Sequence, residues 1–218
     1  MSRPKTKLRS PLTKDRVLKA AIRLADKGGI DSLSMRKLGQ ELGVEAMSLY
    51  NHVKNKDEVL DGIVEVVVRE VEVPSAEVDW KAALRQNAIS AHDALMRHPW
   101  AASLWWRRAE GPDRMRGAEF MLRTLREAGF SEELTYHAYH VLVGHILGFS
   151  LQAISFPIES KEELQELAAD FLQSFPADEY PYMAEHIRQH VDPGDSNEGA
   201  FAFGLDLILD GLERMRDA

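Results

Sequence analysis

The sequence predicts an all-α fold, with a small three-helix domain at the N-terminus followed by a larger helical body. Apolar residues recur at spacings of three and four along most of the 218 residues, as on one face of a helix. No alternating apolar run is bounded by hairpin turns, and the sequence has no glycine-rich phosphate loop and no internal repeat. The length suffices for one or two domains with a sizeable core.

Three short helices are expected first. Thr13 is the predicted N-cap of the first helix, which ends at the glycine pair 28–29. Ser34 can cap a second helix that Gly43 ends, and a short third helix is expected over residues 45–52. These proportions are those of a helix-turn-helix.

A fourth helix is expected to run without a break from Asn55 to Val73. Asn55 and Glu58 have the spacing of a capping box. The β-branched run IVEVVVREVEV could be taken for a strand, but its apolar spacing of four and the cap favour a helix. Pro74 ends the pattern.

The body contains longer helical patterns, expected over residues 79–97, 112–128, 132–154, 161–174 and 197–216. Ser160 and Glu163 form a second capping box, and three prolines between 175 and 195 predict a loop with a short helix. The apolar run 138–154 contains two histidines and is slightly short for a membrane span. A helix buried against other helices is the better interpretation, so no membrane partner is expected.

The net charge of -8 is unevenly distributed. Residues 1–60 hold 13 Lys and Arg against 7 Asp and Glu, whereas the remainder holds 14 against 28. A basic first quarter on an acidic body favours a local polyanionic partner, with a solvated charge run as the alternative. The basic residues of the N-terminal arm are spaced two apart, at Arg3, Lys5, Lys7 and Arg9. The arm either follows the DNA backbone or minor groove or is disordered.

The second and third predicted helices have the residue types that a DNA-binding helix-turn-helix needs. Gly39 leaves room for close helix packing, and Gly43 permits a left-handed turn. Val44, Leu49 and Val53 can hold the third helix against the first two. Its opposite face is then free to enter a major groove, which accommodates an α-helix.

Residues 29–60, GIDSLSMRKLGQELGVEAMSLYNHVKNKDEVL, and the preceding LTKDRVLKAAIRLAD resemble the TetR family of transcriptional regulators. VKNK looks especially close to the tetracycline-repressor branch. The resemblance implies a basic arm (1–12), a helix-turn-helix DNA-binding domain (13–58) and a helical effector-binding and dimerisation domain (59–218). It also implies operator DNA and a second copy of the chain as partners.

The resemblance implies a set of DNA-contacting residues, which are Ser34, Arg36, Ala46, Met47, Ser48, Tyr50, His52 and Lys56. Arg36 is expected to read a guanine, and Tyr50, His52 and Lys56 to donate to phosphates. Ala46 and Met47 can offer a thymine methyl only apolar contact, so Arg36 is expected to carry more of the specificity. In the alternatives, Arg36 pairs with an acidic neighbour (Glu41 or Asp31), Tyr50 packs and His52 faces solvent.

The body is expected to supply dimerisation through the helices near 132–154 and 197–216. An effector pocket, mostly apolar with a few polar groups, is predicted from the residues His92, Trp105, His137, His140, His145 and Phe149. Most body aromatics are ordinary core residues in the alternative interpretation. No carboxylate has the spacing of a metal site with these histidines, so neither a metal nor a cofactor is expected.

Together these features predict a homodimeric transcriptional regulator, a repressor released from a palindromic operator by a largely apolar or aromatic small molecule. An activator or an effector-independent regulator is the nearer alternative. A small helical enzyme or carrier is the other, but no nucleophile–base motif supports it, and we expect no enzyme activity. The chain lacks cysteine, and its first ten residues lack the apolar core of a signal peptide, so a cytoplasmic location is expected.

Overall fold

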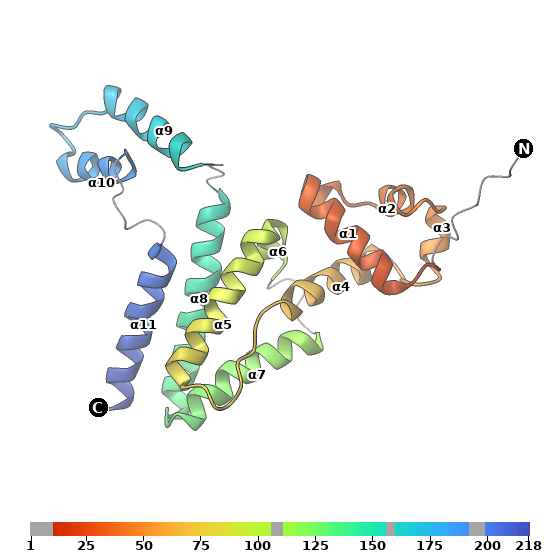
Figure 1. Ribbon diagram of the computed structural model, residues 1–218, viewed down its shortest axis with the longest axis horizontal. Helices are drawn as coiled ribbons and strands as arrows, with labels where there is room; N and C mark the ends of the chain where they lie inside the picture. The colour runs from red at the N-terminus through yellow and green to blue at the C-terminus, as the bar shows by residue number, and fades with distance from the viewer. Residues whose placement is uncertain (1–10, 106–110, 156–159, 192–198) are drawn as a thin grey trace, which may run out of the picture. The chain divides into compact units, whose positions relative to one another are not determined.

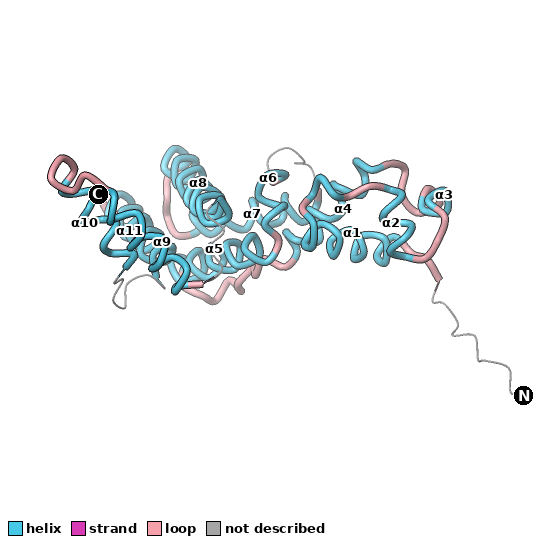
Figure 2. Tube along the Cα trace, turned by 90° about the horizontal axis from the view of Figure 1, so that it is seen from above, coloured by secondary structure: helices cyan, strands magenta, loops and turns pink. Residues whose placement is uncertain are grey.

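The computed structural model describes residues 11–105, 111–155, 160–191 and 199–218, and within these residues it contains helices and connections only (Figures 1 and 2). The elements in chain order are α1 (Lys14–Gly28), η1 (Ile30–Ser32), α2 (Met35–Leu42), α3 (Ala46–Leu49), α4 (Lys56–Arg69), α5 (Trp80–Arg97), α6 (Pro99–Leu104), α7 (Pro112–Glu127), α8 (Glu132–Ser155), α9 (Lys161–Ser174), α10 (Pro181–Val191) and α11 (Ala200–Arg216). The all-α prediction is confirmed. The predicted basic arm lies almost entirely outside the described residues.

The helices form two compact units, Met1–Ala128 and Gly129–Ala218. The first unit contains α1 to α7, and the second contains α8 to α11. The boundary predicted between residues 58 and 59 falls inside the first unit, within α4 (Lys56–Arg69). The assignment of separate DNA-binding and effector-binding domains therefore stays a prediction.

In the first unit, the predicted caps fix where the helices begin. The Thr13 hydroxyl accepts from the Arg16 N–H (3.3 Å), and the Ser34 hydroxyl accepts from the Lys37 N–H (3.2 Å). A side-chain oxygen that accepts from the first turn satisfies a backbone donor that has no partner within the helix. These two caps place the starts of α1 and α2 as the sequence predicts.

The predicted end of the fourth helix is wrong. Helix α4 stops at Arg69, not at Val73, because α5 binds the backbone that follows. The Ser90 hydroxyl accepts from the Glu72 N–H (2.9 Å), and the buried Asn87 amide donates to the Glu72 carbonyl (2.6 Å). Pro74 also disfavours helical backbone at the residue before it.

Two smaller differences concern short helices. The third helix is a single turn, Ala46–Leu49, and not eight residues; the Tyr50 and His52 N–H groups donate to carbonyls three residues back, as in a tight turn. Helix α6 was not predicted; it is six residues long and begins with Pro99, which suits a first helical position. The short helix predicted among the prolines is confirmed as α10.

In the second unit, α8 packs against α11 and α9 packs against α10. The His145 ring stacks on Phe201 (centroids 4.8 Å apart, 21° between planes), and Phe149 meets Phe201 edge-on at 5.5 Å. Helix α8 is long and apolar enough to cross a membrane, a test that core helices of soluble proteins also pass. Its contact with α11 agrees with the expected helix–helix packing.

Candidate DNA-binding and effector sites

The turn between α2 and α3 depends on two glycines. Gly43 has φ 67° and ψ 36°, the left-handed conformation that glycine adopts without steric cost. A Cβ added to Gly39 would lie 2.8 Å from the Val44 carbonyl oxygen and 3.1 Å from the Ala46 nitrogen. Both neighbours are backbone atoms, so they cannot move aside as a flexible side chain would. The close packing predicted for Gly39 is confirmed.

Apolar side chains hold the helix-turn-helix from within. Leu33, Leu38, Leu49 and Val53 are almost fully buried, with at most 2% of their surface exposed. On the outside, Met47 is 75% exposed and Tyr50 is 44% exposed. The short third helix therefore has a buried face and a face available to a partner, which accounts for its mixture of apolar groups and hydrogen-bond donors.

We define the recognition surface as the side chains of Arg36, Met47, Tyr50, His52 and Lys56. None of them makes a hydrogen bond or ion pair with another described side chain or backbone group. The alternative ion pair of Arg36 with Glu41 or Asp31 is not observed. Glu41 instead lies 3.4 Å from Arg23. Tyr50 is exposed and not packed, whereas His52 is half-buried. Arg36, Tyr50, His52 and Lys56 thus have polar groups that no other described residue engages, so they are available to a partner molecule or to water.

Lys56 is placed by the first turn of α4. The Asn55 side chain accepts from the Glu58 N–H (2.8 Å), as the capping box predicts. The Glu58 carboxylate, however, reaches one residue further back and accepts from the Lys54 N–H (2.6 Å) and from the Lys14 ammonium (2.5 Å). The hydrogen bond from Lys14 is the main cause that lowers the pKa of Glu58, and the Lys54 N–H adds to it. Glu58 thus connects the starts of α1 and α4.

The predicted effector residues do not form one cluster within either unit. In the second unit His145 and Phe149 pack on α11, and the His145 Nε2 lies 3.0 Å from the Phe201 carbonyl oxygen. His137 and His140 lie on the exposed face of α8, where both contact Tyr136. His145 and Phe149 are therefore occupied in helix packing.

In the first unit, His92 is half-buried on α5, and Trp105 follows α6 with the Arg114 guanidinium 5.8 Å from its ring. No group of three or more His, Asp or Glu side chains among the described residues is placed to hold a metal ion.

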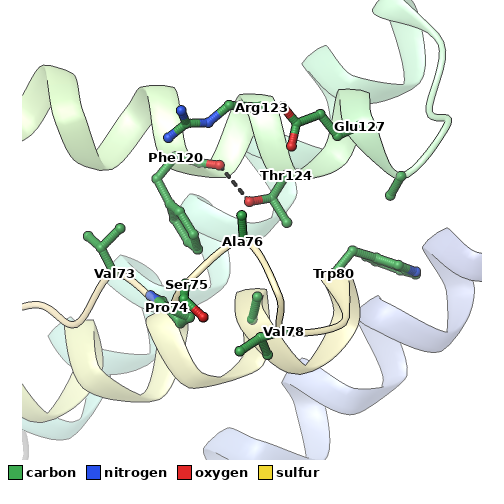
Figure 3. Close-up of a pocket in the computed structure, with 12 residues that line it drawn as sticks. Val73, Pro74, Ser75, Ala76, Val78, Trp80, Phe120, Arg123, Thr124 and Glu127 are labelled. Carbon is green, nitrogen blue, oxygen red and sulfur yellow. Dashed lines mark hydrogen bonds between the residues drawn. The ribbon is translucent and has the colours of Figure 1, made fainter.

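A cleft of about 380 Å³ lies between the α4–α5 connection and α7, and none of the predicted effector residues lines it. Figure 3 shows Val73 to Ser75 on one side, with Phe120 and Thr124 of α7 facing them. Arg123 and Glu127 supply charge, and neither makes an ion pair with another described residue. The lining suits a small molecule with an apolar body and a polar group.

Sequence reasoning missed two polar clusters that join α1 and α4 to the later helices of the first unit. In one cluster, Asp26 of α1 meets His98 and Trp100 around the start of α6. In the other, Arg69 of α4 forks onto Asp113 at the start of α7, with Nε and Nη2 at 2.9 and 2.6 Å from one carboxylate oxygen. The partners are 44 to 74 residues apart, so no local spacing could reveal them.

Glu65 completes the second cluster. Its Oε2 accepts from the Asp113 N–H (2.9 Å), so a carboxylate of α4 caps the first turn of α7. A Cβ at Gly111 would overlap that carboxylate, within 2.3 Å of its atoms. Asp113 holds the pKa of the Arg69 guanidinium above its ordinary value, chiefly through the hydrogen bond between the two side chains.

A helix-turn-helix whose outer face has no polar partner among the described residues, followed along the chain by further helices, is the architecture of a DNA-binding transcriptional regulator. Residues 17–63 match the family described as "Bacterial regulatory proteins, tetR family", and residues 73–216 match "Tetracyclin repressor-like, C-terminal domain". The chain belongs to the TetR family.

The relatives and solved structures include proteins that match nearly the whole chain. The HTH-type transcriptional repressor DrrR1 of Streptomyces coeruleorubidus is 32% identical over 97% of this chain and 81% of its own length. The tetracycline repressor protein class D of Escherichia coli is 32% identical over 93% of this chain and 89% of its own length. The crystal structure of ActR from Streptomyces coelicolor with actinorhodin has 30% identity and a TM-score of 0.75, covering 96% of this chain and all of ActR.

Proposed function

We propose that this protein is a ligand-responsive transcriptional repressor that binds operator DNA through the recognition surface. The observation that carries the proposal is the exposed face of α2 and α3, whose donors have no partner among the described residues while the opposite face is buried. Repressors among the relatives support the direction of control. In the same proposal Ser34, Ala46 and Ser48 also face the DNA, since they lie at the starts of α2 and α3.

Arg36 is the proposed base reader. Replacing it with alanine should lower affinity for DNA selected by the wild-type protein from a random duplex pool by about 1–3 kcal/mol, because a bidentate contact to guanine is lost. Affinity for random duplex should fall much less. Fluorescence anisotropy titrations of both DNAs measure the two losses, with the exposed neighbour Lys37→Ala as control. Equal losses of Arg36→Ala on both DNAs would contradict the assignment of base reading.

Pairing of two half-sites requires a dimer, and α8 and α11 offer a surface for it. Large apolar side chains lie exposed on both helices: Tyr136, Val141 and Leu151 on α8, and Phe203, Leu207 and Met215 on α11. A Cβ at Gly144 or Gly148 would meet nothing within 4 Å, so a second copy could approach α8 closely. We propose a four-helix interface between two copies.

Sedimentation velocity tests this interface. Phe203→Lys should shift the protein toward monomer, because it places a charge in an apolar interface. Met47→Lys adds the same charge at an exposed site on α3 and should leave the sedimentation coefficient unchanged. A wild-type protein that sediments as a monomer at micromolar concentration would contradict the homodimer.

The proposed effector is a largely apolar or aromatic small molecule, as the actinorhodin bound to ActR suggests. An effector acts by binding one conformation of the dimer better than the other. Half-sites lie about 34–36 Å apart or at multiples of that spacing, so a small change in the separation of two recognition helices lowers affinity. Two places for the effector are compared: the surroundings of Trp105, one of the predicted residues, and the cleft that Trp80 helps to line.

The effector proposal is tested by titrating actinorhodin and other polycyclic aromatic compounds into the complex of protein and selected DNA. Release of DNA by a compound that also quenches tryptophan fluorescence supports it. Trp80→Phe and Trp105→Phe then show which site is occupied, since only the variant at the occupied site loses quenching. If compounds that bind neither release DNA nor strengthen its binding, the effector part is wrong.

DNA-binding regulators are not enzymes, and we extend this expectation to the chain, together with a cytoplasmic location where operator DNA is accessible. The alternative, an enzyme or carrier that uses the histidines, would require turnover that His140→Ala abolishes. An activator remains the closer alternative, and a reporter gene placed behind the selected DNA distinguishes it by the sign of the response.

A further inference from the structure

One carboxylate oxygen connects α1 to the segment that joins α5 and α6. The Trp100 indole N–H donates to Asp26 Oδ1 at 2.6 Å, and the His98 Nδ1 lies 2.8 Å from the same oxygen. Asp26 lies in the last turn of α1, and His98 lies between the end of α5 and the start of α6. Three helices therefore meet at this oxygen, and one of them belongs to the helix-turn-helix.

A second carboxylate extends the contact to α4. Glu70, the C-cap of α4, lies 3.4 Å from His98 Nε2 through one oxygen and 3.0 Å from the Arg97 guanidinium through the other. The His98 side chain is only 12% exposed and has a carboxylate at each ring nitrogen. The imidazole thus lies between the ends of α1 and α4.

The side chains that contact Asp26 are held in place because they are largely buried. Trp100 is 6% exposed, so its indole cannot turn to solvent without unpacking, and loss of the acceptor leaves a buried N–H without a partner. The Asp26 side chain is 32% exposed, which moderates the strength of the contact but not its geometry. Hydrogen bonds to an ionised group are the shorter and stronger kind.

The apolar core of the helix-turn-helix does not include this contact. On α1 the apolar residues Val17, Ala20, Ala21 and Ala25 are at most 1% exposed and form the core with α2 and α4. Asp26 lies outside that core. Its hydrogen bond to Trp100 joins α1 to α6 through polar atoms with a defined geometry, in addition to the apolar packing between the helices.

We infer that Asp26, with His98 and Trp100, is a positioning residue that sets the orientation of the helix-turn-helix and hence the spacing of half-sites that the dimer accepts. The inference rests on the proposed pairing of two half-sites. Asp26 touches no DNA in this account. Its effect should appear only when both recognition helices must fit one duplex.

Asp26→Ala and Trp100→Phe test the inference in the full-length protein. The probes are selected DNA with both half-sites, the same DNA with one to three base pairs inserted between or removed from the half-sites, and a single half-site. Asp15→Ala is the matched control, because it removes another α1 carboxylate, one that forms its ion pair with Lys19, four residues along the same helix. Circular dichroism on heating monitors the fold of every variant.

The wild-type protein and Asp15→Ala should prefer one spacing. Asp26→Ala should lose about tenfold or more in affinity at that spacing, with a broadened or shifted preference, and change less than twofold on the half-site. Trp100→Phe should show the same pattern more weakly, and the double variant should be no worse than Asp26→Ala, since both remove one contact. Asp26→Asn keeps an acceptor for Trp100 and should recover part of the loss.

Three results would overturn the inference. An unchanged spacing preference in Asp26→Ala overturns this inference and leaves the proposed pairing of half-sites intact. Equal losses on full DNA and half-site, accompanied by a lower melting temperature, show that Asp26 has only a structural role. No spacing preference in the wild-type protein overturns the pairing of half-sites, and with it this inference.

Discussion

Charged side chains lack internal partners on the recognition surface, whereas they are paired in the junction that joins α1 and α4 to the later helices of the first unit. We define the junction as the side chains of Asp26, Glu65, Arg69, His98, Trp100 and Asp113. Every member of the junction contacts another helix through a hydrogen bond or ion pair. No member of the recognition surface does so with a described residue.

This difference separates two roles within one compact unit. An exposed cation without an internal partner costs little in water and remains available to a phosphate or a base edge. A partly buried charge must be paired, and once paired it holds two helices in one relation. Changes on the recognition surface should therefore alter DNA affinity with little effect on stability, whereas changes in the junction should alter stability or geometry.

The largest effect is expected where the recognition surface depends on packing. Gly39→Val would push a side chain into the backbone of residues 44 to 46, and overpacking of this kind costs about 1–3 kcal/mol of unfolding free energy. DNA binding should be lost with it, because α3 is displaced. Urea unfolding measures the loss, and Gly117→Val is the control, since a Cβ at Gly117 meets nothing within 4 Å. A stable Gly39→Val that binds normally would contradict the close packing.

In the junction, Asp113→Ala should lower the free energy of unfolding by about 1 kcal/mol, a value limited by the 62% exposure of the Arg69 side chain. The slope of log affinity against log salt should not change, because Asp113 touches no phosphate. Arg116, which also pairs with Asp113, gives the control: Arg116→Ala should cost less, as its contact is longer at 3.1 Å. A changed salt slope in Asp113→Ala would contradict the claim that the junction affects stability and not phosphate contacts.

On the recognition surface, Lys56→Ala should leave the free energy of unfolding unchanged. It should weaken selected and random DNA about equally and reduce the salt slope by about 1, as expected for one phosphate contact. Titrations at several salt concentrations measure the slope, with the neighbouring Lys54→Ala for comparison. Loss of sequence preference without a change in slope would contradict the phosphate role.

The smallest effect concerns pH. The pKa of Glu58 is lowered in the folded protein, so its contribution to stability is present above the ordinary carboxyl pKa of about 4.3 and is lost as pH falls through the lowered value. Glu58→Gln should flatten the decrease of stability on acidification in that range. Thermal melts between pH 3 and pH 7, a range set by ordinary carboxyl titration, compare it with the wild-type protein. An unchanged pH profile would show that Lys14 and Glu58 do not interact appreciably in solution.

The sequence was most informative where the determining contacts are local. The caps at Thr13, Ser34 and Asn55 each depend on a side chain and an N–H three residues later, and all three are confirmed. The same holds for Gly39 and Gly43, whose role is fixed by a turn of a few residues.

The sequence was least informative where distant residues decide. Helix α4 ends early because Asn87 and Ser90, on α5, bind the backbone of Glu72. The junction escaped prediction for the same reason, since Asp26 and Trp100 are 74 residues apart. Among the predicted effector residues, the packing of His145 on Phe201 depends on a helix 56 residues further along the chain.

Hydrogen–deuterium exchange with and without the selected DNA tests the central claim most directly. If the recognition surface binds DNA, exchange should slow in peptides that cover residues 34–56, and it should change little in peptides from α11. Unchanged exchange over 34–56 at saturating DNA, or slowing confined to α7, would contradict the claim that α2 and α3 form the DNA-binding site.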